Sequence, residues 1–235
     1  MSATRSIRLW FLTLCFCTLG ALRVEASEFY YVMIFGSQSQ PKRLELSHTW
    51  ATFVKAVGEG TDPDSYTLEA HTISWLPASL DVKIMRLRPE TGVNLDHAQT
   101  MAFVTGQGQG VTMWGPFIVN AQIWNRSLEV RSLIESGRVS YRAISTARNL
   151  FISDCIHAVA SVDPELGRRH YPLIRIGKPA SRYVARQIVL RSVFDQSAFD
   201  NSWLIPRLGI DRDPITIVPP CRIPEIPCFL CMIPE

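Results

Sequence analysis

The heptapeptide S-D-C-I-H-A-V at residues 153–159 places two helix-capping residues directly before a cysteine. The side-chain oxygen of Ser153 or Asp154 can accept a hydrogen bond from the free amides of a first helical turn, so the stretch predicts a helix that begins at Cys155. A thiol in that turn would face unpaired amides and the positive end of the helix dipole, and both favour the thiolate. Cys155 can equally be a small buried apolar residue, because free cysteine is among the most buried residue types.

The first 26 residues have the pattern of a secretory signal peptide. Arg5 and Arg8 form a positive segment, residues 9–22 are apolar, and V-E-A at residues 24–26 puts small residues at the cleavage site. The apolar run is shorter than the roughly 18 residues that a spanning helix needs, and no later stretch reaches that length. We therefore predict cleavage after Ala26, export to the periplasm or the extracellular space, and no transmembrane anchor in the mature chain.

The remaining chain has the length of one ordinary domain, which we place at residues 27–218. The formal net charge of the full chain is +3, and removal of the predicted signal peptide lowers it to +1, so the overall charge indicates neither nucleic acid nor a membrane surface as a partner.

The tail at residues 219–235 carries five prolines and three cysteines. This density of proline excludes a helix or a central strand, so we expect the tail to be disordered. Cys228 and Cys231 form a C-x-x-C pair with only Cys221 nearby, whereas a structural zinc site needs four ligands. We predict no metal and no cofactor, and a disulfide within the tail is an open alternative.

Aromatic and β-branched runs predict the strands of one antiparallel sheet. Turn residues at 58–65 lie between the second and third of these runs, so we expect those two strands to form a hairpin with a long tip. The predicted strands are residues 29–35, 48–57, 66–75, 82–87, 138–144, and 111–119 with an interruption at Gly115-Pro116.

Helical spacing of apolar residues predicts three further helices. Asn94 can cap a helix that runs to about Val104, Gly137 can end a helix over residues 121–136, and a third helix covers residues 180–194. The expected fold class is α+β, an antiparallel sheet with packed helices.

Three chemically active residues follow one another along this pattern. His48 opens one strand in H-T-W-A, His71 ends the next in L-E-A-H, and Cys155 opens the later helix in D-C-I-H-A-V. This order resembles the circularly permuted branch of the NlpC/P60 papain-like superfamily, especially proteins similar to lecithin retinol acyltransferase. In that branch a strand opens with H-W-A, a V-G-D-G turn follows, the next strand carries V-I-H, and a helix begins N-C-E-H-F-V. The matching residues here are His48, Trp50, Ala51, Val57, Gly58, Gly60, His71, Cys155, His157 and Val159.

The resemblance implies a permuted papain-like fold and a catalytic set of Cys155, His48 and His71. A thiolate would attack a carbonyl carbon, while an imidazole holds the thiol proton and later returns it to the leaving group. The resemblance puts the base at His48, so His71 would orient the base or be a bystander. His157, two residues past the cysteine, points elsewhere on the helix and is expected to be structural.

The geometry of the hairpin limits which histidine can contact the cysteine. A turn centred near Thr61–Asp62 would pair His48 with Trp75 and Thr52 with His71, which puts both histidines on the same face. They would lie about 13 Å apart, at ~3.3 Å per residue along the strand, so only one could contact Cys155. Direct pairing of the two would need the turn at Glu59-Gly60 and a bulge beyond it.

Two functions follow from these patterns. The first is an exported thiol-dependent hydrolase or acyl transferase that acts on an amide or ester, with a cell-wall peptide as the usual exported substrate of the superfamily. The alternative is an exported, non-catalytic binding or structural protein that keeps the fold. The ordered His, His and Cys favour the enzyme. Asp154 favours the alternative, because a negative charge beside a thiol opposes thiolate formation.

Overall fold

The computed structural model describes residues 26–60, 62–145, 151–163, 176–191, 193–196 and 200–220. Residues 1–25 and 221–235 lie outside this description, and with them the predicted signal peptide and nearly all of the predicted tail.

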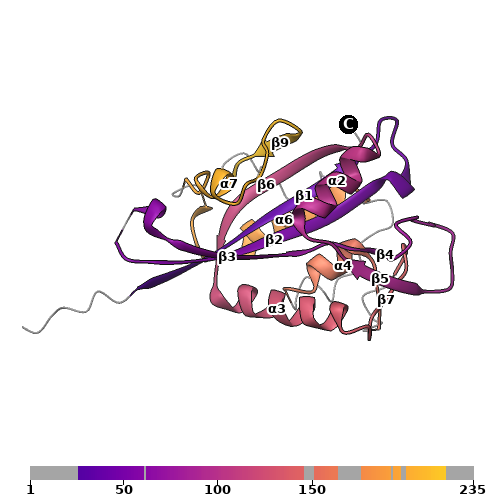
Figure 1. The fold of residues 1–235 in the computed structure, drawn as a ribbon, viewed down its shortest axis with the longest axis horizontal. Helices are drawn as coiled ribbons and strands as arrows, with labels where there is room; N and C mark the ends of the chain where they lie inside the picture. Colours follow the sequence, from indigo (N-terminus) through magenta and orange to yellow (C-terminus); the bar gives the residue numbers. More distant parts are fainter. Residues whose placement is uncertain are drawn as a thin grey trace, which may run out of the picture.

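The largest element is a five-stranded sheet in the order β3-β2-β1-β6-β9 (Figure 1). The central strand β1 pairs antiparallel with both β2 and β6, β2 pairs antiparallel with β3, and β9 runs parallel to β6. The strands are β1 (Ser27–Gln38), β2 (Ser47–Gly58), β3 (Thr67–Ile73), β6 (Gly110–Val119) and β9 (Ile215–Val218). The strands predicted at 29–35, 48–57 and 111–119 are thereby confirmed, and so is the antiparallel hairpin of β2 and β3. The strand predicted at 66–75 ends at Ile73, and Trp75 belongs to a separate strand of a second sheet.

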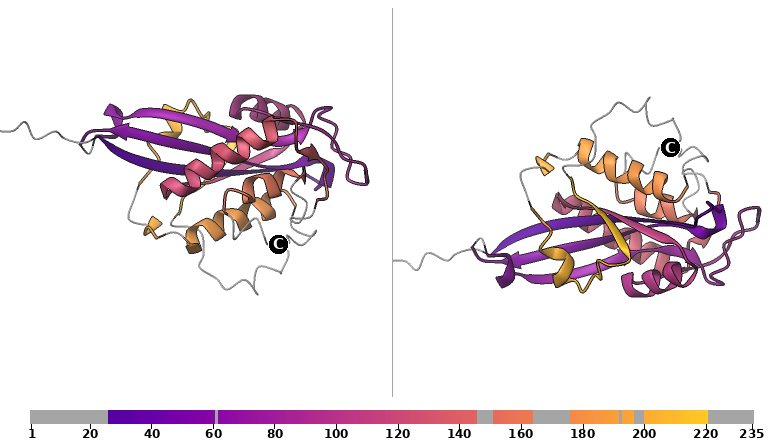
Figure 2. Two further views of the ribbon diagram at one scale, coloured as in Figure 1. Left: turned by 90° about the horizontal axis from the view of Figure 1, so that it is seen from below. Right: turned by 90° about the horizontal axis from the view of Figure 1, so that it is seen from above.

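Helices cover both faces of this sheet, so the described part of the chain has three layers (Figure 2). One face packs against α3 (Ala121–Glu135), α4 (Cys155–Ala160) and α6 (Lys178–Arg191), and we call it the α4 face. The other face packs against α2 (His97–Gly106) and α7 (Leu204–Arg207), and we call it the α2 face. This double cover explains why β1 is apolar on both sides, since a strand buried on both faces reads as a continuous apolar run.

Alternation along β2 assigns each of its side chains to one of these faces. Ala51 and Phe53 belong to the core of the α4 face, whereas Trp50 and Val54 belong to the core of the α2 face. Odd-numbered residues of β2 therefore point toward α4, and even-numbered residues point toward α2.

A small second sheet lies beside the end of the main sheet, in the order β4-β5-β7-β8. Its strands are β4 (Trp75–Pro77), β5 (Glu90–Asn94), β7 (Ser140–Tyr141) and β8 (Ile152–Ser153). The strand predicted at 82–87 is wrong, because those residues form the loop between β4 and β5 and pair with no described strand. Of the strand predicted at 138–144, only the two residues of β7 form a strand, because only these pair with residues of β5 and β8.

Local capping chemistry accounts for the helix boundaries. Asp154 caps α4 as predicted, and Asn120 caps α3 by accepting from the Ile123 amide at 3.0 Å. The cap of α2 is Asp96 rather than the predicted Asn94, because Asp96 and Gln99 form a reciprocal capping box. The helix predicted at 180–194 is α6, which begins and ends a few residues earlier. The expected α+β class is confirmed.

Candidate functional site

Cys155 is the first residue of α4, at the place that the sequence predicted for it. It is half-buried, forms no disulfide, and packs against the core of the α4 face. Because α4 lies over β2, the thiol approaches the backbone of Thr49. The Thr49 side chain, which points to this face, has its hydroxyl 2.8 Å from the Ser181 hydroxyl of α6.

A buried carboxylate organises the start of α4. Asp154 Oδ1 accepts from the His157 backbone amide at 2.8 Å, and Oδ2 lies 2.7 Å from both the Ser145 hydroxyl and His157 Nδ1. The Ser145 amide also donates to Oδ2 at 3.2 Å. These contacts give both oxygens of the Asp154 carboxylate hydrogen-bond partners while it caps the helix. The His157 side chain is one of these partners and holds the carboxylate in place.

The protonation of the thiol is decided by burial and by this carboxylate. Burial and then the charge of Asp154 raise the pKa of Cys155 to about 12. The backbone groups of Thr49, Ile156 and Cys155 itself lower the pKa by less than these two effects raise it. The helix start therefore does not give the activated thiol that its sequence suggested.

His48 lies on the α2 face, opposite to the face that carries Cys155. Its ring stacks on Trp50 at 5.5 Å between centroids, and its Nε2 is 2.9 Å from the Ser74 hydroxyl. Thr100 of α2 donates to the same hydroxyl at 2.8 Å. Burial lowers the pKa of His48 to about 3, so the ring is neutral at ordinary pH. The predicted Cys155–His48 pair is not brought together.

His71 points to the α4 face but contacts α3 rather than α4. Its ring stacks on Phe53 and on Trp124, with Nε2 2.8 Å from the Ser127 hydroxyl. The single proton of that hydroxyl goes to the Trp124 carbonyl at 2.7 Å, so His71 Nε2 must be the donor in the first bond. No hydrogen bond joins Cys155 to His71 or His48 among the described residues. The predicted catalytic residues therefore do not form one site: Cys155 lies at the start of α4, His48 beside α2, and His71 beside α3.

The register of the hairpin explains this outcome. His71 pairs with Phe53 and Thr72 with Thr52, one residue away from the register that a turn at Thr61–Asp62 was expected to give. Since side chains alternate along a strand, a shift of one residue moves a side chain to the other face. The expectation that both histidines share a face is wrong for this reason.

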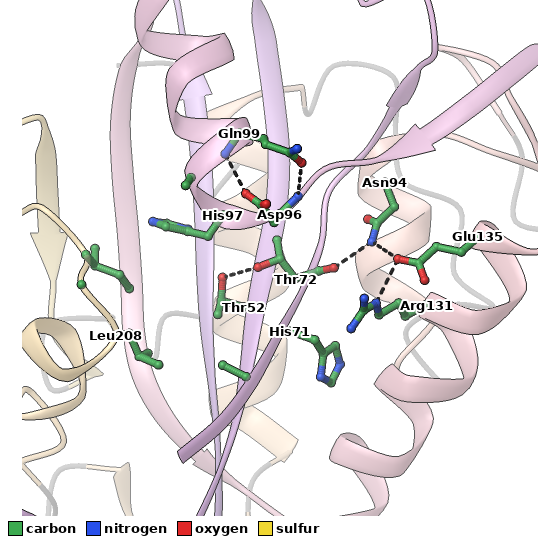
Figure 3. Close-up of a pocket in the computed structure, with 14 residues that line it drawn as sticks. Thr52, His71, Thr72, Asn94, Asp96, His97, Gln99, Arg131, Glu135 and Leu208 are labelled. Atoms are coloured by element: carbon green, nitrogen blue, oxygen red, sulfur yellow. Dashed lines mark hydrogen bonds and ion pairs between the residues drawn. The ribbon is translucent and has the colours of Figure 1, made fainter. Parts of the chain in front are cut away.

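A cavity of about 540 Å³ lies at the outer edge of β3 (Figure 3). The start of α2 forms one wall, the last turns of α3 form another, and the chain after α7 closes the end. Its lining residues are Thr52, Ala70, His71, Thr72, Asn94, Asp96, His97, Ala98, Gln99, Arg131, Glu135, Leu208, Gly209 and Ile210.

Asn94 shows which backbone groups of β3 face this cavity. Its side-chain nitrogen donates to the Thr72 carbonyl at 3.0 Å, and its oxygen accepts from the Ser74 amide at 2.7 Å. The carbonyl of Thr72 therefore points away from β2. Backbone groups of alternate residues point the same way, so the amide and carbonyl of Ala70 also face outward. Within the described part of the chain, no hydrogen bond to these Ala70 groups occurs.

The walls of the cavity are polar, and among the described residues Asp96 is their one charged side chain without an ion pair. Arg131 Nε donates to Glu135 Oε1 at 2.9 Å, and Asn94 Nδ2 donates to the same oxygen at 2.9 Å. Burial lowers the pKa of His97 to about 4, which keeps this ring uncharged as well. The sequence did not predict this site, because its residues come from β2, β3, β5, α2, α3 and the segment after α7 and form no motif. The only signal was Asn94, which was interpreted as a helix cap.

In the described ranges, no group of three or more His, Cys, Asp or Glu side chains is arranged to hold a metal ion. The helices of that same part of the chain are too short or too polar to cross a membrane. Comparison of the sequence and fold with protein-family models, curated proteins and solved structures finds no match.

Proposed function

We propose that this protein acts after export as a non-catalytic binding protein built on a permuted papain-like fold. The observation that carries the proposal is that Cys155 and His48 lie on opposite faces of the main sheet. A cysteine nucleophile needs a base within hydrogen-bonding reach of its thiol, and the sheet itself separates these two residues.

The thiol chemistry supports the same conclusion. With its pKa raised to about 12, the Cys155 thiol is protonated near neutral pH. The family resemblance is supported by the position of α4, whose first residue is the cysteine and which packs on the strand that opens H-T-W-A. The fold would then have kept the cysteine helix while the base points to the other face.

The cavity beside β3 is the candidate binding site. The outward amide and carbonyl of Ala70 can pair with an amide ligand as an added strand would, and the polar walls suit an extended, peptide-like chain. A peptide-like ligand fits this chemistry, and a cell-wall peptide is the exported example to which the resemblance points.

The first experiment measures the reactivity of Cys155. Iodoacetamide labelling is followed across pH in the mature chain with Cys221, Cys228 and Cys231 replaced by serine. We expect labelling to be slow below pH 8 and unchanged by His48→Ala. Rapid labelling at pH 6 that slows in His48→Ala would contradict the proposal.

The second experiment tests the cavity with a soluble cell-wall stem peptide in isothermal titration calorimetry. Ala70→Pro removes the outward amide, and proline is tolerated on an edge strand whose N–H faces outward. We expect this variant to bind at least tenfold more weakly, while the control Ala70→Ser, which keeps the amide, binds like the wild type. Equal binding by all three proteins would exclude this edge as the site, and no binding by the wild type would exclude the ligand class.

A thiol-dependent hydrolase or acyl transferase is the second candidate. It is favoured by the backbone groups of Thr49, Ile156 and Cys155 around the sulfur, which resemble the donors that stabilise an oxyanion. The labelling experiment separates the two candidates, because only the enzyme needs a reactive thiol near neutral pH.

A further inference from the structure

The loop between β4 and β5, residues 78–89, extends beyond the body of the protein. It forms the right-hand tip of the molecule in Figures 1 and 2. Its base is held by the pairing of β4 with β5 and by the Ala78 amide, which donates to the Thr91 carbonyl at 2.8 Å. A further turn is closed inside the loop, where the Arg86 amide donates to the Lys83 carbonyl at 3.2 Å. The loop is thus a defined projection with a fixed base.

Two large apolar side chains stand almost completely in solvent on this loop. Met85 is 87% exposed and Leu87 is 84% exposed, whereas the large apolar side chains of the adjoining strands, such as Trp75 and Leu76, are buried. Val82 and Ile84 on the same loop are half-buried, so the apolar character continues from the tip toward the base. Exposed apolar side chains gathered on a projection indicate an interaction surface.

Basic side chains alternate with these apolar ones. Lys83 and Arg86 are held in ion pairs with Asp81 at 3.1 Å and Glu90 at 3.0 Å. The Glu90 side chain is only 14% exposed, so this carboxylate lies at the base of the loop and not at its tip. Arg88 is exposed and has no ion pair with any carboxylate in the described ranges. Lys83 and Arg86 are thus offset by acidic partners, and Arg88 is the cation beside Met85 and Leu87 that has none in the described ranges.

We propose that this loop docks on the surface of an anionic lipid bilayer, with Met85 and Leu87 inserted and the neighbouring cations at the level of the headgroups. Two apolar side chains on a narrow loop cannot supply the roughly 800 Å² per partner that a stable protein interface buries. A bilayer requires only that the tip enters, and long basic side chains can keep their charges in the headgroup region while their stems lie in the apolar layer.

We expect the loop to bind the bilayer reversibly and with modest affinity. Arg88, as the unpaired cation of the loop, should contribute about a fivefold gain in binding to an anionic surface. Met85 and Leu87 add an apolar contribution that does not depend on lipid charge. Binding should therefore be strongest with anionic vesicles, weaker with neutral vesicles, and reduced by high salt.

The test is cosedimentation of the mature chain with vesicles of mixed phosphatidylglycerol and phosphatidylcholine, compared with vesicles of phosphatidylcholine alone. We expect the wild type to bind the anionic vesicles and the double variant Met85→Ser, Leu87→Ser, which removes the apolar side chains without a change in charge, to lose at least tenfold in binding. Arg88→Gln should lose about fivefold on anionic vesicles and nothing on neutral ones. None of these side chains is part of a core, so the variants should remain folded.

The matched control is Val193→Ser, which replaces an exposed apolar side chain by an uncharged polar one at a residue that is 83% exposed after the end of α6. It should bind vesicles like the wild type. The proposal is overturned if the wild type does not bind anionic vesicles, or if the double variant binds as the wild type does. A loss in Arg88→Gln without a loss in the double variant would also overturn it, because the attachment would then be electrostatic and without insertion.

Discussion

His71 lies directly opposite Phe53 in the β2–β3 pair, and this one relationship separates the two histidines that the sequence placed together. Phe53 points to the α4 face, so His71 does too, whereas His48 shares the α2 face with Trp50. The histidines are consequently built into two different cores. Their roles follow from that position: each ring is stacked on an aromatic neighbour and bonded to a buried serine.

The register of this hairpin can be tested by cross-linking. Lys55 lies opposite Glu69, so the variant Lys55→Cys, Glu69→Cys should form a disulfide on oxidation in a background without other cysteines. Directly paired residues place their Cα atoms about 5.5 Å apart, which is within the range that a disulfide spans. Lys55→Cys, Leu68→Cys is the control, because those residues would be opposite each other in the register expected from a turn at Thr61–Asp62. Efficient closure of the control pair, read by mass spectrometry, would mean that the register is shifted by one residue.

The buried histidines should make the fold sensitive to acid. The folded pKa of His48 is about 3, far below the ordinary value of 6.5, so between these values the unfolded chain binds a proton that the folded chain does not. The contribution of His48 to the free energy of unfolding is therefore fully present above pH 6.5 and is lost progressively as the pH decreases toward 3. His48 alone should cost about 2 kcal/mol between pH 7 and pH 5.

His48→Gln provides the measurement, because glutamine can keep the bond to Ser74 and cannot titrate in this range. Urea denaturation gives the free energy of unfolding at pH 7 and at pH 5. The loss of this free energy between the two pH values should be about 2 kcal/mol smaller in the variant than in the wild type. His71 and His97, whose pKa values burial lowers to about 4, should leave part of the acid sensitivity in place. An unchanged pH difference in His48→Gln would show that His48 is not buried as a neutral ring.

The cap at the start of α4 should be far more important for stability than an exposed cap. Asp154→Ala removes a carboxylate that is only 5% exposed and accepts bonds from Ser145 and His157, so we expect a loss of about 2–4 kcal/mol. Asp96→Ala removes the exposed cap of α2 and should cost about 1 kcal/mol. Thermal or urea unfolding of the two variants gives the comparison, and equal losses would contradict the buried network.

Asp154 should also affect the cysteine. Because the charge of Asp154 raises the pKa of Cys155, Asp154→Asn should shift iodoacetamide labelling to lower pH while it keeps a capping side chain. The shift should remain when His48 is changed to alanine, since His48 lies on the other face. If labelling of Asp154→Asn depended on His48, the His48 side chain would influence the reactivity of Cys155, and this would contradict their placement on opposite faces.

Local chemistry determined much of this fold directly from the sequence. The aromatic run at 29–35 identified a buried strand, Asp154 identified the start of α4, and Gly137, with φ of 75°, ended α3 as expected. These features are local, because burial on both faces, side-chain capping and a positive φ each leave a signature within a few residues. Alternation alone was not enough at residues 82–87, since a strand also requires a partner, and the neighbouring segments pair elsewhere.

The tertiary structure alone decided the candidate site. Side chains alternate with a period of two, so a single residue in the register of β2 and β3 chooses the face of each histidine, and the length of a turn does not specify that residue. The cavity likewise depends on Asn94, Asp96 and Arg131, which come from the end of β5, the cap of α2 and the last turns of α3. The residue types in the sequence indicated which chemical groups are present. The packing of elements that are distant in the chain determined which of these groups contact one another.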